Sequence, residues 1–211
     1  MITTEQYKLF DDLYSFYNKE LFDGLLNDCM ITTSRKKRYF GFFAHNIWKK
    51  NKSKDGVEIH EICLNPDFLD RIDEEWQATL VHEMVHLWQQ DFGKTSRAGY
   101  HNKQWAQKMK EIGLYPSSTG EEGGKETGQL CSHYIIPDGA FIEAFKRLQE
   151  KQIKYITVAN LVEGGGKGKA AAASARSKTK YICPCGNKVW GKPSLSIMCN
   201  NCNQLFIEEE I

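Results

Sequence analysis

The sequence of 211 residues contains no hydrophobic run long enough to cross a membrane. A transmembrane helix needs roughly 18 or more predominantly apolar residues, and a signal peptide needs a basic region before its apolar core. The N-terminal segment MITTEQYKLF offers neither feature. We therefore expect no secretion and no membrane contact. We predict a cytoplasmic protein, nucleoid-associated or nuclear according to its host.

The sequence also lacks internal repeats, and its composition changes along the chain. Residues 1–163 have the mixed composition of a globular domain and end with a predicted short strand at 154–162. Residues 164–180, GGGKGKAAAASARSKTK, have the composition of a flexible basic linker. Residues 181–211 hold four of the seven cysteines. We predict a domain, a linker and a small Cys-rich module.

Disulfides are not expected, because the clustered cysteines have the spacing of metal ligands. Such clusters are typical of proteins in a reducing compartment. One pair is C-x-C, one residue shorter than the usual C-x-x-C of zinc ribbons, and the other is C-x-x-C. A module this small needs metal for its stability, so we predict a structural zinc ion rather than an unstructured tail of reactive thiols. The predicted ligands are Cys183, Cys185, Cys199 and Cys202.

Acidic residues are missing from two stretches of the chain. Eight Lys or Arg residues lie between Cys29 and Lys54, and seven more lie in 164–192. Because the net charge is only +1, the rest of the chain is acidic. A single basic run would suit a solvated surface or a linker, whereas two favour contact with a polyanion such as nucleic acid.

The N-terminal half begins with a predicted helix and continues with predicted strands. Thr3 and Gln6 form a capping box pattern, and apolar residues then recur at helical spacing as far as Gly24. Aromatic and β-branched residues dominate from Met30 to Leu64. This stretch predicts three strands, of which the last two form a hairpin.

Further helices are predicted from their capping residues. Asp73 is expected to cap a long helix that ends near Gly93, and Asn102 and Asp138 are expected to cap two later helices. Residues 116–129 are rich in Gly and Ser and are predicted to be a loop. The sequence therefore predicts an α+β domain.

The long helix contains the segment VHEMVH. Residues four apart lie on nearly the same face of a helix, so the imidazoles of His82 and His86 can converge on one ion. Glu83 falls beside that face, where its carboxylate can take a proton from a water molecule whose pKa zinc lowers to roughly 7. This pattern is typical of a zinc peptidase. The alternative is a helix with two ordinary histidines.

A catalytic zinc site needs a third protein ligand and an open fourth position. His101 follows His86 by fifteen residues at the start of the next predicted helix, and a loop of that length can return beside the metal helix. His133 lies farther along the chain. His45 and His60 lie in predicted strands, where ordinary roles are commoner. We predict His101 as the third ligand.

Three segments of the chain resemble those of the SprT-like zinc metalloproteases, which include the Spartan proteases that degrade proteins crosslinked to DNA. They are LVHEMVHLWQ, GYHNKQWAQKMKEIG and the Cys-rich ribbon that begins at KYICPCG. The resemblance implies a zincin-like domain whose metal-binding HExxH helix packs on a small antiparallel sheet, followed by a zinc ribbon. It also implies zinc ligation by His82, His86 and His101, with Glu83 as general base.

The resemblance further implies binding to single-stranded or unpaired DNA. The segment RKKRYFGFFAHNIWKK interleaves basic and aromatic residues, as expected where bases stack and phosphates are neutralised, although aromatic residues in a strand also commonly fill a core. Residues of the ribbon could likewise face nucleic acid or pack its hairpin. The candidates for DNA contact are Arg35, Lys36, Lys37, Arg38, Lys188, Trp190 and Lys192.

We therefore expect a monomeric zinc-dependent endopeptidase with one catalytic and one structural zinc ion, acting on DNA-bound or DNA-crosslinked proteins in DNA repair. One alternative is a nucleic-acid-binding or regulatory protein with a structural zinc site and little peptidase activity. Another is a peptidase that acts on a soluble partner. Tyr100, His133 and Tyr134 are candidate donors to the oxyanion, and the sequence does not rank them.

Overall fold

The computed structural model divides into two compact units, Met1–Ala170 and Ala171–Ile211. The predicted strand 154–162 and most of the predicted linker 164–180 lie outside the described residues. The structure describes residues 1–37, 39–50, 56–149, 179–191 and 195–208.

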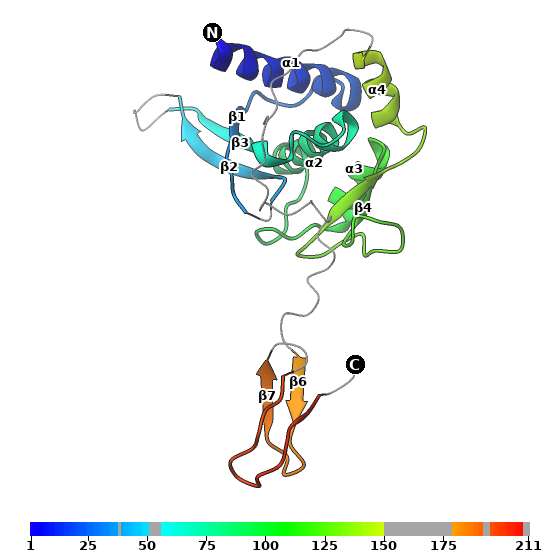
Figure 1. Ribbon diagram of the computed structural model, residues 1–211. Coiled ribbons are helices and arrows are strands. Elements are labelled where there is room, and N and C mark those ends of the chain that lie inside the picture. The colour runs from blue at the N-terminus through cyan, green and yellow to red at the C-terminus, as the bar shows by residue number, and fades with distance from the viewer. Residues whose placement is uncertain (38, 51–55, 150–178, 192–194, 209–211) are drawn as a thin grey trace. The chain divides into compact units, whose positions relative to one another are not determined.

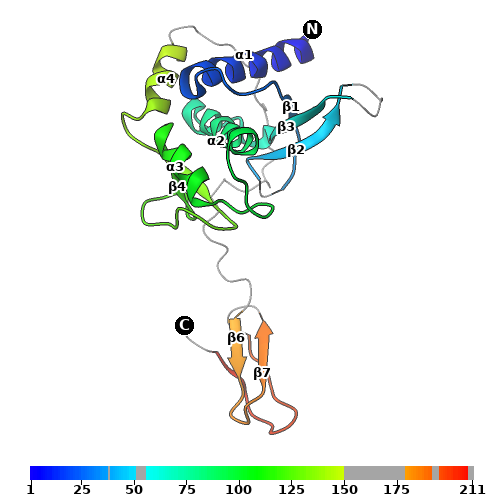
Figure 2. The same ribbon diagram turned by 180° about the vertical axis from the view of Figure 1, so that it is seen from behind.

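The first unit combines helices and small sheets around a central helix. Figures 1 and 2 show α2 in the middle of this unit, where it contacts strands of the sheet as well as α3 and α4. None of the helices in the described part of the chain has the length and hydropathy needed to span a bilayer. The elements are α1 (Ile2–Phe22), β1 (Met30–Thr33), β2 (Gly41–Lys49), β3 (Glu58–Leu64), a 3-10 turn (Pro66–Phe68), α2 (Asp73–Phe92), α3 (Lys103–Glu111), β4 (Leu114–Ser117), β5 (Ser132–Ile135) and α4 (Ala140–Gln149).

The three predicted strands are present and form a sheet in the order β1-β3-β2. β2 and β3 are antiparallel, as the predicted hairpin requires. β1 runs parallel to β3, so this sheet is mixed rather than antiparallel throughout. The parallel pairing sets Ile31 beside Ile62, and both side chains are buried in the core. Burial of this pair stabilises the register.

A second, two-stranded sheet occupies part of the region predicted as a loop. β4 pairs antiparallel with β5, with Pro116 opposite His133 and Ser117 opposite Ser132. Both strands are only four residues long, and proline is unfavourable within a strand. The sequence pattern therefore does not indicate this sheet, and the prediction of a loop from residue 116 is wrong at its start.

Two of the predicted helix caps are wrong. Met1 is the N-cap of α1, so Thr3 lies inside the helix, and Asp73 is the first helical residue of α2 instead of its cap. The cap at Asn102 is confirmed, because its side chain accepts a hydrogen bond from a backbone amide of α3. Asp138 has a φ of 55° and lies in a turn two residues before α4.

Large aromatic side chains fill the core around α2. The Tyr17 hydroxyl donates to Oε1 of Gln77 over 2.6 Å, and the Tyr17 ring stacks on Phe141 with 5.7 Å between centroids. An apolar stripe runs along α2, where three residues are fully buried and Trp88 packs partly buried against the core. These contacts hold α2 in place from α1 and α4. The buried stripe residues are Ala78, Val81 and Val85.

The second unit is a small antiparallel sheet with buried cysteines. β6 (Thr179–Ile182) lies between β7 (Lys188–Gly191) and β8 (Ile207–Glu208). β6 begins two residues inside the predicted linker. Among the described residues of this unit, the buried hydrophobic side chains are Tyr181, Cys183 and Cys199, so the apolar core there is small.

Candidate metal centre

Three histidines converge in the first unit. His82 and His86 lie one turn apart on α2, and His101 lies just before α3. Their ligand nitrogens all lie within 4.8 Å of one another, and the ring centroids of His86 and His101 are 4.9 Å apart. The structure thus brings together the three predicted ligands. We refer to them as the three-histidine cluster.

The protonation state of the three-histidine cluster suits a metal ion. Burial and the neighbouring imidazoles hold the pKa of His82 well below its usual range and lower that of His86 to about 3. Burial also lowers the pKa of His101. Neutral imidazoles are the form that binds zinc, so the cluster has the donor set of a zinc site.

His101 is held by its own hydrogen bonds to Gly128 and by a hydrogen bond that its neighbour Asn102 makes to α2. Its Nδ1 lies 3.1 Å from the carbonyl oxygen of Gly128, and the two residues also pair through their backbones. As donation from Nδ1 leaves the lone pair on Nε2, Gly128 sets the tautomer that a metal ligand needs. The next residue, Asn102, accepts a hydrogen bond from Gln89 of α2 over 2.7 Å. His101 is therefore held against the helix that carries its partners.

Glu83 lies next to the cluster and is 6% exposed. Burial raises its pKa to about 8, although a hydrogen bond from the backbone of Phe43 opposes the shift. Strand β2 covers this side chain closely, since a Cβ on Gly41 would lie 3.4 Å from Cγ of Glu83. In the metal-free protein Glu83 is therefore mostly protonated at neutral pH.

Two aromatic residues that the sequence pattern does not mark as part of the site also contact the cluster. The Trp105 ring lies 4.9 Å from His82, 5.1 Å from His86 and 4.4 Å from His101, measured between centroids. Phe43 stacks on His86 at 6.4 Å. Trp105 follows His101 by four residues at the start of α3, a spacing that could have signalled the contact.

His133 reaches the cluster from β5. Its Nδ1 lies 3.0 Å from Nδ1 of His82, with 5.1 Å between ring centroids. Among the described residues, however, the group of converging ligand atoms holds the other three histidines and not His133. Burial and the nearby Arg71 lower the pKa of His133 to about 4, so its ring is neutral. Tyr134, another candidate oxyanion donor, stacks on Tyr115. The third candidate, Tyr100, has the guanidinium of Arg97 5.0 Å from its ring centroid.

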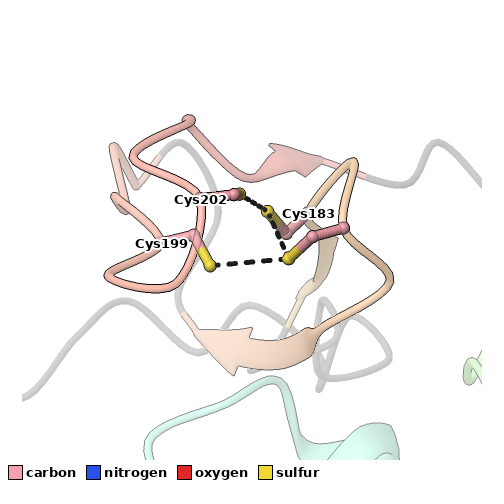
Figure 3. A group of neighbouring side chains, drawn as sticks. Cys183, Cys199 and Cys202 are labelled. Atoms are coloured by element: carbon pink, nitrogen blue, oxygen red, sulfur yellow. Dashed lines mark hydrogen bonds between the residues drawn. The ribbon is translucent and has the colours of Figure 1, made fainter.

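The four cysteines of the second unit form a second cluster. Sγ of Cys183 lies 3.2 Å from that of Cys202 and 3.3 Å from that of Cys185, and Cys185 lies 3.7 Å from Cys199. Figure 3 shows the sulfur atoms of Cys183, Cys199 and Cys202 facing a common centre. A Zn–S bond of about 2.3 Å places tetrahedral sulfurs roughly 3.8 Å apart. The cluster could therefore form a zinc site.

The shortened C-x-C pair fits this cluster because the chain turns sharply after it. Gly186 has a φ of 91°, and its amide donates to the carbonyl oxygen of Cys183 over 2.8 Å. A hydrogen bond from Asn187 is the largest cause that lowers the pKa of Cys199 to about 6, which favours its thiolate. Burial raises the pKa of Cys183 to about 12 in the absence of metal.

The basic residues predicted to contact DNA are mostly at the surface. Arg35 is exposed and pairs with Asp67 at 3.1 Å. Lys36 and Lys37 are exposed, and Nζ of Lys36 lies 4.9 Å above the ring of Phe42. Lys188 is exposed and Trp190 lies in β7, whereas Arg38 and Lys192 lie outside the described residues.

The aromatic residues interleaved with these charges are partly buried. Phe40 packs edge-to-face on Phe68 with 4.7 Å between centroids, and Phe43 packs against the core. Trp48, near the end of β2, is 42% exposed. Packing therefore accounts for part of the aromatic pattern, and the remainder lies at the surface.

Comparison with known families agrees with this geometry. The model of the SprT-like family matches residues 10–121, just over half of the chain, and this range contains His82, Glu83, His86 and His101. His133 and the second unit lie outside it. Searches among curated proteins and solved structures gave no match. The family is consistent with a metalloprotease. The chain belongs to the SprT-like family.

Proposed function

We propose that this protein is a zinc-dependent endopeptidase with a zincin-like site, in which His82, His86 and His101 hold the zinc ion. The observation that carries the proposal is the convergence of three imidazoles, with the buried Glu83 next to His82 on the same helix. A site that only stabilises the fold needs no such carboxylate. Membership of the SprT-like family supports the same reaction.

Glu83 acts as the general base in this proposal. A zinc ion in the three-histidine cluster would supply a Lewis acid that polarises the peptide carbonyl and lowers the pKa of water to roughly 7. Its positive charge would also favour the ionised form of Glu83, whose pKa is about 8 in the metal-free protein. The carboxylate then accepts a proton from the attacking water and later donates it to the leaving amine.

The substrate is proposed to bind along β2. This strand lies at the edge of its sheet, and it packs on α2 at Glu83. An extended peptide can add to an edge strand through backbone hydrogen bonds. A peptide bound in this way would pass the base without needing a particular side chain, which suits an enzyme with varied protein substrates.

The proposed substrates are proteins bound or crosslinked to DNA. Lys36, Lys37 and Lys188 are exposed and lie in the two stretches that lack acidic residues. Neutralisation of phosphates by such side chains supplies most of the affinity in non-specific DNA binding. If several phosphates are neutralised, binding to single-stranded DNA will weaken steeply as salt rises. Binding that is absent or independent of salt would favour a peptidase acting on a soluble partner instead.

The decisive experiment replaces Glu83 by Gln and measures cleavage of a DNA-binding protein with and without single-stranded DNA. The variant should retain its zinc and lose at least about 100-fold in kcat, since removal of a general base typically costs 100- to 10,000-fold. Glu75→Gln is a matched control, because Glu75 is exposed on the same helix. Unchanged cleavage by Glu83→Gln would refute the proposal and favour a structural zinc site.

A further inference from the structure

One of the three proposed zinc ligands has a second imidazole as its hydrogen-bond partner. His133 comes from β5, 51 residues after His82, and the two Nδ1 atoms are 3.0 Å apart. This distance is that of a hydrogen bond, so one Nδ1 carries the proton and the other accepts it. The contact therefore couples the tautomers of the two rings.

The assignment of that proton follows from what a metal ligand requires. A histidine that donates from Nδ1 keeps its lone pair on Nε2, where it can bind metal. A neutral imidazole has one ring nitrogen that carries no proton, so Nδ1 of His133 can be the acceptor in this hydrogen bond. His101 is held in the same manner, because its Nδ1 faces the carbonyl oxygen of Gly128 at 3.1 Å.

We infer that His133 is a positioning residue of the metal site, which accepts the Nδ1 proton of His82 and so presents Nε2 of His82 to the zinc ion. This inference rests on the proposed function. The inference gives the two-stranded sheet a role. The pairing of β5 with β4 holds His133 opposite Pro116, and from there His133 contacts His82 of α2. His133 also lies outside the range that matches the family.

Two substitutions separate hydrogen bonding from packing. In His133→Asn, Oδ1 can take the approximate place of Nδ1 and accept the same proton, whereas His133→Leu fills space and accepts nothing. Zinc affinity is measured on the full chain by chelator competition, counting the two zinc ions expected per chain. We expect His133→Leu to lower the affinity for one of these zinc ions by 10- to 100-fold, which is the usual cost of losing such a hydrogen-bond partner. His133→Asn should bind that zinc ion with an affinity close to that of wild type.

Equal zinc affinity for wild type and His133→Leu would overturn the inference, as would equal losses in both variants. His45→Ala is the matched control, because His45 is exposed, and it should leave zinc affinity unchanged. His82→Ala tests the underlying proposal separately. If that variant still binds two zinc ions, the proposed metal site is wrong, whereas loss of one ion with no effect of His133→Leu would refute only the role of His133.

The tautomers themselves give a second readout. In the zinc-loaded protein, nitrogen NMR of the imidazole rings should show the proton of His82 on Nδ1 and that of His133 on Nε2. A proton on Nδ1 of His133 would contradict the inference, because that nitrogen could no longer accept. A residue that merely fills space would not fix either tautomer.

Discussion

Gln89 donates a hydrogen bond from Nε2 to Oδ1 of Asn102 over 2.7 Å, and thereby ties α2 to the residue that follows His101. Asn102 is the N-cap of α3, and the same Oδ1 accepts a hydrogen bond from the backbone amide of Trp105. Nδ2 of Asn102 donates a hydrogen bond to the carbonyl oxygen of Lys94. One side chain thus joins α2, the intervening loop and α3. The position of the third proposed ligand depends on it.

Asn102→Ala should lower both stability and zinc affinity. Loss of an Asn N-cap typically costs about 0.5–2 kcal/mol, and Gln89, which is buried, loses a partner at the same time. Urea denaturation measures the first effect and chelator competition the second. The control is Gln107→Ala, an exposed position on α3, which should change neither quantity. Wild-type zinc affinity in Asn102→Ala would show that His101 is held by other contacts.

Gly41→Val should reduce peptidase activity through β2. A Cβ at this position would lie 3.0 Å from the carbonyl oxygen of Cys63 and 3.2 Å from Cγ2 of Thr79, so a larger side chain must push β2 away from α2 at Glu83. Overpacking of this kind costs typically about 1–3 kcal/mol. Thermal denaturation and kcat/KM measure the effect, and Gly41→Ala should be milder.

The exposed Ala98 offers a control for Gly41→Val, because Ala98→Val adds the same kind of bulk at the surface and should be silent. Activity in Gly41→Val equal to that of wild type would mean that close contact between β2 and Glu83 is not required for cleavage.

The metal-free protein should lose stability relative to Glu83→Gln as pH rises. Burial raises the pKa of Glu83 from 4.5 to about 8, so the protonated carboxyl stabilises the fold fully below pH 4.5, and this contribution is lost as pH rises through 8. The difference in free energy of unfolding between the two proteins should therefore change by on the order of a few kcal/mol over this window.

Chemical denaturation with chelator present, repeated across the pH window, measures that difference. His86 acts in the opposite direction, because its pKa is lowered to about 3 and its contribution to stability is lost as pH falls below 6.5. This contribution is common to both proteins and cancels in the comparison. A difference that does not vary with pH would contradict the buried, protonated state of Glu83.

Removal of metal should unfold the second unit and leave the first folded. In the described part of the second unit, the buried hydrophobic side chains are one tyrosine and two cysteines, which provide too little apolar surface to fold such a small module alone. Cys199→Ser should reduce the zinc content from two ions to one and abolish protection of residues 179–208 from hydrogen exchange. Cys131→Ser, outside the cluster, is the matched control.

Protection of residues 179–208 that persists in Cys199→Ser would show that thiolate ligation is not needed for this fold. Protection in α1 and α2 should be unchanged in either case, since their core is built from apolar contacts within the first unit.

The sequence predicted the parts of this protein that depend on local geometry. The helical repeat sets His82 and His86 on one face of α2, where their ring nitrogens converge. The antiparallel pairing of β2 and β3 follows from two segments rich in aromatic and β-branched residues. The cysteine spacing predicted a four-thiol cluster even with its shortened first pair.

The sequence by itself therefore determined the helix that carries two proposed ligands and the base, and the identity of the Cys-rich module, because each depends on residues a few positions apart. Only the tertiary structure decided that Gln89 holds His101 in place through Asn102, and that the imidazole of His82 contacts that of His133. The first contact joins residues 13 positions apart, and the second joins residues 51 positions apart, one of which lies in a short sheet that no sequence pattern indicates. Their partners are set by the packing of the whole domain.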